Sequence, residues 1–393
     1  MTETARTHGL DGALVEPDWP PLAADEVHGL LRGFGCAEPV QILTVSPRPF
    51  SAASVVACGA RRLFVKRHHR AVRSREGLGE EHRFMAHLLA HGLSVPRVLA
   101  DGNGETAIEQ GEWTYEVHEV PAGVDLYADA LSWTPFFSSA HARSAGEALA
   151  RLHCAAEGFD APRRRVQPLV AGFTIFAGED PRAALDEYLG ARPGLKRFPS
   201  ARRTCIAGLN LLAPFHAELK PLLPAFKPLW THNDLHGSNL LWDSDSADSR
   251  AVAVIDFGLA DRTCAVHDIA QAIERSIVEW LDLLPGSAYA GSARVHLDHL
   301  AAFLDGYAAV RPLAAQEAAA LAPMTALCHA EFALTEADYF CTVLHSDEKT
   351  MLALDDYLAG HARWFRGNDG QRLLDWIRAW AAAREPRPAG VSS

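Results

Sequence analysis

The chain has 393 residues, of which 48% are hydrophobic and 22% charged, and its formal net charge is −12. At about 150 residues per domain, this length predicts two or three domains or lobes, and the composition excludes a disordered or collagen-like chain. The acidic surplus argues against a general nucleic-acid-binding protein and against a polybasic membrane-surface protein, because both need excess Lys and Arg. It leaves room for a small cationic substrate.

The sequence shows no sign of membrane insertion or secretion. No apolar stretch approaches the roughly 18 residues that a transmembrane helix needs, and residues 1–20 lack the basic and apolar regions of a signal peptide. The seven cysteines are scattered, without a CxxC pair. We therefore expect reduced thiols in a cytoplasmic protein and no zinc site, despite 19 histidines.

The first third of the chain predicts a flexible leader over residues 1–22 and a small β-rich lobe over residues 23–120. Hydrophobic spacing and turn residues in this lobe predict strands near residues 40–45, 54–58, 63–66, 97–100, 105–109 and 113–120. They also predict a short helix near residues 24–34 and a long one over residues 80–91.

The remainder, residues 121–384, predicts a larger and mainly helical lobe. Its helical patterns are interrupted by two short strands, near residues 239–242 and 251–255, which the polar stretch 243–250 should join as a hairpin. Residues 385–393 are rich in Pro, Gly and Ser, which predicts a disordered tail.

The most informative stretch begins at His232-Asn233-Asp234, with Asn239 five residues further on and Asp256-Phe257-Gly258 directly after the second strand of the hairpin. Phosphoryl transfer needs a carboxylate near the attacking hydroxyl and oxygen ligands for Mg²⁺. Asp234 is the candidate for the first role, and Asn239 and Asp256 are the candidate metal ligands. The hairpin should place Asn239 beside Asp256.

This order of motifs resembles the kinase-fold phosphotransferases of the aminoglycoside phosphotransferase, choline kinase and homoserine kinase branch. His232-to-Asn239 (HNDLHGSN) is similar to that branch's H-G-D-x-H-x-x-N, the segment 266–270 (VHDIA) to its Y-D-L-A, and the segment 148–153 (ALARLH) to its A-L-A-x-L-H. The resemblance implies an α+β, bilobal, protein-kinase-like fold and transfer of the γ-phosphoryl of ATP, with Mg²⁺, to a small-molecule hydroxyl. It also implies that Asp268 anchors the larger lobe.

The small lobe supplies candidates for binding the nucleotide. Lys66 ends an apolar strand and resembles the kinase lysine that contacts the α- and β-phosphates. Its ion-pair partner should be a Glu on the following helix, where we favour Glu81 over Glu80 and Glu76.

Two further elements of the nucleotide site are placed by position along the chain. The loop over residues 46–54 should cover the phosphates although it contains no Gly, and Ser51 and Ser54 are small enough to allow a close approach. No Walker A sequence is present. The resemblance places the hinge between the lobes near residue 120, with the Glu119 carbonyl and the Val120 N–H as adenine contacts.

The acceptor is weakly specified by the sequence. An amino sugar, an amino alcohol or a hydroxy amino acid would fit the branch, and acidic residues of the larger lobe would suit a cationic acceptor if they lined a cleft. Solvated helix faces are the alternative interpretation of those residues, which are Glu274, Glu279, Glu331, Glu336 and Asp338. A peptide Ser/Thr kinase, a non-catalytic ATP-binding protein and a nucleic-acid-binding module remain rival interpretations of the whole chain.

Overall fold

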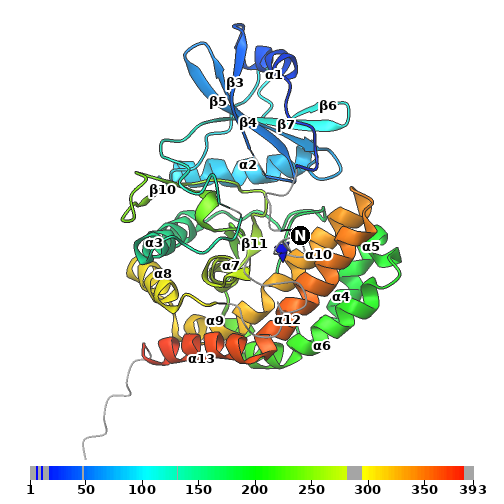
Figure 1. Ribbon diagram of the computed structural model, residues 1–393, viewed down its shortest axis with the longest axis vertical. Helices are drawn as coiled ribbons and strands as arrows, with labels where there is room; N and C mark the ends of the chain where they lie inside the picture. The colour runs from blue at the N-terminus through cyan, green and yellow to red at the C-terminus, as the bar shows by residue number, and fades with distance from the viewer. Residues whose placement is uncertain are drawn as a thin grey trace, which may run out of the picture.

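In the computed structural model, a five-stranded antiparallel sheet forms the core of the smaller lobe (Figure 1). The structure describes residues 6–7, 10–11, 17–46, 48–130, 132–280 and 294–384. The strand order is β3-β4-β5-β7-β6, with bounds β3 (Val40–Val45), β4 (Ala52–Cys58), β5 (Arg61–His69), β6 (Ile108–Gln110) and β7 (Trp113–Glu119). Gly59 has φ +58°, and this left-handed conformation closes the tight turn between β4 and β5.

The two faces of this sheet have different neighbours. Val56, Val65 and Val117 pack with α1 (Ala24–Leu31) in a separate small core. Because side chains alternate along a strand, Lys66 and Glu116 lie on the opposite face. That face is directed towards α2 (Arg75–Ala90), which lies between the sheet and the larger lobe (Figure 1).

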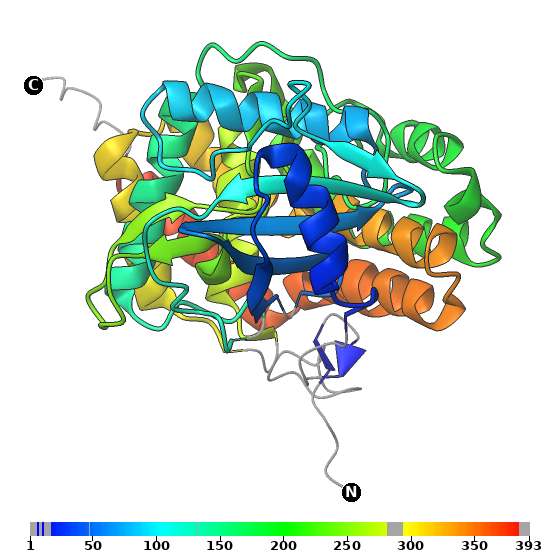
Figure 2. The same ribbon diagram turned by 90° about the horizontal axis from the view of Figure 1, so that it is seen from above.

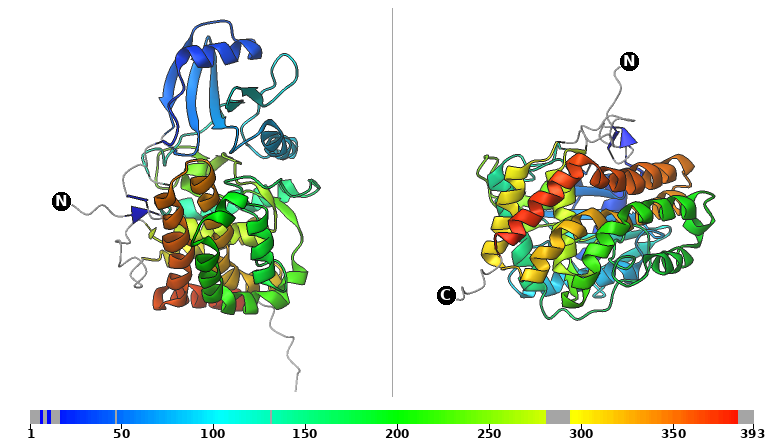
Figure 3. Two further views of the ribbon diagram at one scale, coloured as in Figure 1. Left: turned by 90° about the vertical axis from the view of Figure 1, so that its right-hand side faces the viewer. Right: turned by 90° about the horizontal axis from the view of Figure 1, so that it is seen from below.

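The larger lobe is a bundle of helices beneath the sheet, as the views from above and from the side show (Figures 2 and 3). The helices are α3 (Ser139–Ala156), α4 (Pro181–Gly190), α5 (Pro193–Arg197), α6 (Ala201–Leu219), α7 (Ala265–Ile277), α8 (Leu297–Val310), α9 (Ala315–Leu327), α10 (His329–Thr342), α11 (Asp347–Met351), α12 (Ala359–Arg366) and α13 (Asn368–Ala382). Shorter helical segments are Arg32–Phe34, Lys220–Ala225, Gly237–Asn239 and the π-helical Leu352–Leu358. In the described part of the chain, no helix combines the length and the apolar character needed to cross a membrane.

Short antiparallel strand pairs lie outside the five-stranded sheet. The pairs are β1 (Arg6–Thr7) with β2 (Leu10–Asp11), β8 (Leu229–Thr231) with β11 (Asp261–Thr263), and β9 (Leu240–Trp242) with β10 (Ala251–Val254). The last pair is the hairpin that the sequence predicts. The prediction of an α+β fold with a small β-rich lobe and a larger helical lobe is therefore confirmed.

The structure differs from the sequence-based expectations at the start of the chain and at two of the cysteines. Residues 17–22 were expected in a flexible leader, but Asp18 accepts hydrogen bonds from Tyr339 and Lys349, each at 2.9 Å. Cys36 and Cys58 form a disulfide, so the expectation of reduced thiols is wrong for this pair. They are 22 residues apart in sequence; Cys36 lies in the connection before β3 and Cys58 ends β4, and the pairing of β3 with β4 brings them together. The predicted tail, residues 385–393, lies outside the described residues.

Candidate active site

The loop between β8 and β9 is anchored by the buried carboxylate of Asp268 on α7. Its two oxygens accept hydrogen bonds from the backbone N–H groups of His232 at 2.8 Å and Asn233 at 2.7 Å. The Nε2 atom of His153, on α3, lies 3.0 Å from the same carboxylate. Asn233 has φ +60°, a conformation that costs energy in a non-glycine residue. The buried hydrogen bonds hold the backbone in it, so Asp268 has the anchoring contacts that the resemblance implies.

Asp234 is the carboxylate that this anchored loop presents. Its Oδ2 accepts a hydrogen bond from Nδ2 of Asn239 at 3.1 Å, and its Oδ1 forms an ion pair with Arg275. The guanidinium of Arg275 is completely buried and lies over the rings of Trp133 and Phe332. Burial raises the pKa of Asp234 to about 6, although the charge of Arg275 opposes that rise. The group is thus ionised at neutral pH and positioned by two neighbours.

The hairpin brings Asp256 beside the same loop. The N–H of Ile255 donates to the carbonyl oxygen of Asn239 at 3.0 Å, and Asp256 follows directly with φ +59°. The Lys66 ammonium, from β5 of the smaller lobe, lies 3.1 Å from Asp256 Oδ1. Burial opposes ionisation of Asp256, but Lys66 outweighs it and lowers the pKa of the carboxyl well below its usual value. Asp256 is therefore a carboxylate, and its side chain is 40% exposed.

The chemistry of these donors fits Mg²⁺. Nδ2 of Asn239 donates to the carbonyl and the carboxylate of Asp234, so its amide oxygen remains as a metal donor. Asp256 adds an ionised carboxylate, and hard oxygen ligands of this kind are the ones that Mg²⁺ prefers. Asn239 and Asp256 would hold the ion.

Glu81 contacts a different cation from the one we expected. Within the described residues, the ion pair of Lys66 is with Asp256, whereas Glu81 Oε2 lies 3.5 Å from Nη2 of Arg164. Glu81 nevertheless lies close enough for its charge to contribute, after Asp256 and Glu116, to a raised pKa of Lys66 that burial alone would lower. Glu81 is buried on α2 as the prediction requires, but the direct pairing with Lys66 is absent from this structure.

Two buried arginines connect α2 to the Asp256-Phe257-Gly258 segment. Arg164 donates to the carbonyls of Gly77 and Gly258, each at 3.0 Å. Arg73 donates to the same Gly258 carbonyl at 2.7 Å. Burial, and then the charge of Arg164, lower the pKa of Arg73 to about 10, so Arg73 is still cationic at neutral pH. Through these bonds the position of α2 depends directly on the segment that carries Asp256.

The two phosphate-loop candidates differ in their position relative to β4. β4 begins at Ala52, so Ser51 ends the loop and Ser54 is inside the strand. Ser54 alternates with Ala53 and is directed, like Val56, to the α1 side of the sheet, away from Lys66. A contact between its hydroxyl and phosphate is not supported by this placement.

Arg48 is the residue of this loop that approaches the acidic site. Its Nη1 donates to Ser132 Oγ at 2.9 Å in the larger lobe. Burial lowers the pKa of Arg48, and the charges of Asp125, Asp256 and Asp234 partly offset that effect. The cation therefore lies within electrostatic reach of both acidic site residues.

The predicted hinge lies at the end of β7. The Glu119 N–H donates to the carbonyl of Arg97 at 2.9 Å, which leaves the Glu119 carbonyl and the Val120 N–H as the candidate adenine contacts. Beyond them, Val124 forms two backbone hydrogen bonds with Trp242, at 2.7 and 2.9 Å. The hinge therefore joins the hairpin that positions Asn239 and Asp256.

Four of the five acidic residues considered for a cationic acceptor are buried, and Glu336 is buried with its Oε2 unpaired. Glu331 Oε1 accepts from the backbone N–H of Thr174 and, at 2.6 Å, of Ile175, and Glu274 lies 2.8 Å from His361 Nδ1. Burial raises the pKa of Glu336 to about 8, so this acid is mostly protonated at neutral pH. The remaining two also have partners, Asp338 with Arg192 and Glu279 with His296. The interpretation as solvated helix faces is therefore wrong for the four buried residues, and four of the five acids already contact protein groups.

Three cations that the sequence reasoning did not assign are central to this geometry. Arg275 lies seven residues after Asp268, two turns along the same helix face, and that spacing could have indicated that both reach one loop. Arg48 could have been singled out as the cation of a loop that contains no Gly. No local pattern identifies Arg164, whose partners lie on α2 and at the Gly258 segment.

Comparison with known folds defines the class of protein. A microcompartment-associated aminopropanol kinase has a TM-score of 0.56 at 17% identity, covering 89% of this chain and all of that one. Choline kinase from Cryptosporidium parvum has a TM-score of 0.55 at 14% identity, covering 92% and 100%. At such low identity these similarities show the fold, which is the kinase-like fold that the sequence predicts.

Sequence comparison then identifies the family. The model of the phosphotransferase enzyme family, APH, matches residues 50–313, and the chain belongs to this family. Homoserine kinase from Methylobacterium radiotolerans is 29% identical over 237 residues, and that from Rhodopseudomonas palustris is 26% identical over 238 residues. In both cases the match covers 60% of this chain and 61% of the relative, so the chain spans about three fifths of the length of these curated relatives.

Proposed function

We propose that this protein transfers the γ-phosphoryl group of ATP to a hydroxyl group of a small molecule. The observation that carries the proposal is the convergence of Asp234, Asn239, Asp256 and Lys66 where the two lobes meet. These residues come from the loop after β8, the helical segment just before β9, the turn after β10 and strand β5. They supply a carboxylate, two oxygen ligands and a cation, which are the groups that phosphoryl transfer to an alcohol requires.

Each residue has a defined task in this proposal. Asp234 orients the acceptor hydroxyl and accepts its proton, while Asn239 and Arg275 hold the two carboxylate oxygens in place. Lys66 neutralises the α- and β-phosphates. When bound at Asn239 and Asp256, Mg²⁺ would neutralise charge on the phosphates. Positioning and charge stabilisation provide most of the rate enhancement in this class of reaction.

The remaining contacts to ATP follow the arrangement of the smaller lobe. The Glu119 carbonyl and the Val120 N–H bind adenine at the hinge, and backbone N–H groups near Ser51 cover the phosphates. Arg48 adds a positive charge to the loop, which supports phosphate binding where glycines are absent.

Among acceptors, we favour a hydroxy amino acid over an amino sugar or an amino alcohol. Buried and partnered carboxylates such as Glu331 and Glu274 are unavailable to a cationic group, which weakens the case for a polycationic acceptor. The curated relatives described above are named homoserine kinases. Both observations support an acceptor in which a carboxylate balances the amine.

The test is ADP release from Mg-ATP with a panel of acceptors: homoserine, other hydroxy amino acids, aminopropanol, choline, aminoglycosides and Ser/Thr peptides. We expect turnover with hydroxy amino acids. Asp234→Asn should lower kcat by about 10² to 10⁴ while ATP affinity stays within a few fold. Asp243→Asn, which changes an exposed Asp on the turn after β9, is the matched control and should keep full activity.

Other outcomes would reassign the protein. Turnover of amino sugars or amino alcohols alone would replace the acceptor class, and turnover of peptides alone would support a peptide kinase. ATP binding without turnover on any acceptor, together with equal behaviour of the wild type and the Asp234→Asn protein, would support a non-catalytic ATP-binding protein.

A further inference from the structure

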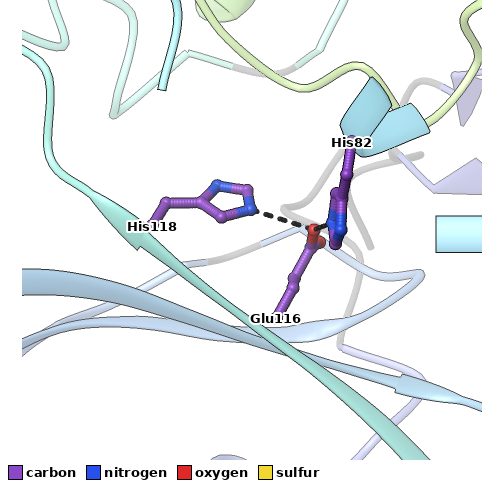
Figure 4. A group of neighbouring side chains, drawn as sticks. All are labelled: His82, Glu116 and His118. Atoms are coloured by element: carbon purple, nitrogen blue, oxygen red, sulfur yellow. Dashed lines mark hydrogen bonds and ion pairs between the residues drawn. The ribbon is translucent and has the colours of Figure 1, made fainter. Parts of the chain in front are cut away.

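Inside the smaller lobe, two imidazoles converge on one carboxylate (Figure 4). Glu116 Oε2 lies 2.8 Å from Nε2 of His82 and 2.9 Å from Nε2 of His118. The ligand atoms of the three residues all lie within 4.8 Å of one another. The proposed phosphoryl transfer uses none of these side chains, so the cluster needs its own explanation.

Three features of the fold create this cluster. Glu116 and His118 are two residues apart on β7, so their side chains share the sheet face that is directed towards α2. His82 reaches them from the buried side of α2. All three are more than nine-tenths buried, with exposures of 1% for Glu116, 5% for His82 and 7% for His118. A carboxylate at such a depth needs strong compensating partners.

A second layer of polar groups orients the three residues. His68 on β5 places its Nε2 2.9 Å from the other oxygen of Glu116. Thr106 places its hydroxyl 2.9 Å from Nδ1 of His82. In protein metal sites, the second nitrogen of a ligating histidine and the free oxygen of a ligating carboxylate are usually held by such hydrogen bonds.

We propose that His82, Glu116 and His118 bind one divalent transition-metal ion, for which Zn²⁺ is the best candidate. Two imidazole nitrogens and a carboxylate oxygen form a common zinc ligand set, and three protein ligands leave one position for water. Ligand atoms around a tetrahedral zinc lie roughly 3.3 Å apart. The observed separations of 2.8 and 2.9 Å therefore need to widen by only a few tenths of an ångström.

The ion would tie α2 directly to the central part of the sheet. Glu116 pairs across the sheet with Lys66, and His82 follows Glu81 on α2. A metal bridge at this point holds the helix and the strand that carry the nucleotide-binding candidates at a constant separation. Its role is structural, and it is separate from the Mg²⁺ proposed at Asn239 and Asp256.

The competing explanation is a hydrogen-bonded cluster in which each imidazole donates an Nε2–H to Glu116. Glutamine separates the two cases, because its amide N–H can still donate to the carboxylate whereas the amide is a poor zinc ligand. The test variant is therefore His82→Gln/His118→Gln. A second three-residue cluster in the described part of the chain, over residues 296–299, is partly exposed and could bind metal adventitiously. The matched control, His296→Gln/His299→Gln, removes it.

The experiment titrates chelator-treated protein with Co²⁺, followed by visible absorption, and then displaces Co²⁺ with Zn²⁺. We expect one tightly bound equivalent in the wild type and in the control variant, and binding weakened by more than about a hundredfold in His82→Gln/His118→Gln. Chelator should lower the thermal unfolding temperature of the first two proteins only. Absence of stoichiometric binding in the control variant, or undiminished affinity in the test variant, would overturn the proposal.

A second measurement decides the case in which the test variant fails to fold. In the folded control variant, Zn²⁺ should shift the imidazole ¹⁵N resonances of His82 and His118 as their Nε2 atoms lose their protons. If those resonances do not move at saturating Zn²⁺, the cluster is hydrogen-bonded and the metal site is refuted.

Discussion

Replacing Asp268 with Asn tests whether one buried carboxylate maintains the geometry of the loop that carries Asp234. The carboxylate is 0% exposed and accepts from the N–H groups of His232 and Asn233 and from His153. An Asn side chain has a single acceptor oxygen, so at least one buried donor loses its partner and faces an amide N–H instead. Because each buried donor left unsatisfied costs about 1–3 kcal/mol, and more where the lost acceptor was a charged group, we expect a loss of about 2–5 kcal/mol in the free energy of unfolding.

The assay is urea denaturation at pH 7, followed by circular dichroism, with Asp243→Asn as the control. Asp243 also accepts hydrogen bonds, from the Arg250 N–H and from Ser249 Oγ, each at 3.0 Å, but it is exposed to solvent. Water can replace its lost contacts, so the control should change stability far less. Equal destabilisation by the two substitutions would refute the claim that Asp268 anchors the loop.

The pH dependence provides an independent check on the same residue. Burial opposes ionisation of Asp268, but its hydrogen bond and ion pair with His153 keep the pKa below the ordinary Asp value. A lowered pKa in the folded state stabilises the protein above the pKa of the unfolded chain, about 3.9, and this stabilisation is lost as the pH falls. The difference in stability between the wild type and Asp268→Asn should therefore shrink below about pH 4. A difference that stays constant between pH 7 and pH 3 would contradict this account.

Two further predictions concern catalysis. Burial raises the pKa of Asp234 to about 6, and only the ionised carboxylate accepts a proton. The value of kcat/KM should therefore fall about tenfold per pH unit below pH 6 and level off above it. A kcat/KM that is constant down to pH 5 would rule out Asp234 as the proton acceptor. Arg164→Gln should weaken Mg-ATP binding in calorimetry, because Arg164 connects α2 to the Gly258 carbonyl. The neighbouring exposed Arg165→Gln should leave affinity unchanged, and similar affinities for the two variants would show that this connection is dispensable.

Much of the candidate active site could be predicted from the sequence because its residues lie close together along the chain. Asp234 and Asn239 belong to one loop, and Asp256 follows a hairpin whose strands and turn have clear local signals. The Lys66 strand and the following helix were likewise visible from hydrophobic spacing. The ion-pair partner of Lys66 could not be chosen correctly from the sequence, and in the structure Lys66 pairs with Asp256 while Glu81 contacts Arg164. Neighbouring acids on a helix differ only in the direction of their side chains, which depends on packing.

The pairing of charged residues was decided by the tertiary structure alone. Arg275 binds Asp234 from a helix 41 residues further on, and Arg164 reaches back 87 residues to α2. Sequence reasoning could see acidic residues on α10 but not their burial, which removes them as ligands for a cationic acceptor. Burial depends on how helices pack, and hydrophobic spacing within one helix does not specify its neighbours.

The amino-acid sequence by itself therefore determined the fold class, the order of the motifs and the residues of the loop for which we propose phosphoryl transfer, because these depend on local spacing. Only the tertiary structure brought His82 to Glu116 and His118. The sequence contains no short Cys/His spacing that would have indicated a metal site here. The pleat of β7 sets two of these side chains on one face, and the docking of α2 adds the third. His82 and Glu116 are 34 residues apart in sequence, and their contact depends on how α2 packs on the sheet. The spacing of residues along the chain does not predict that contact.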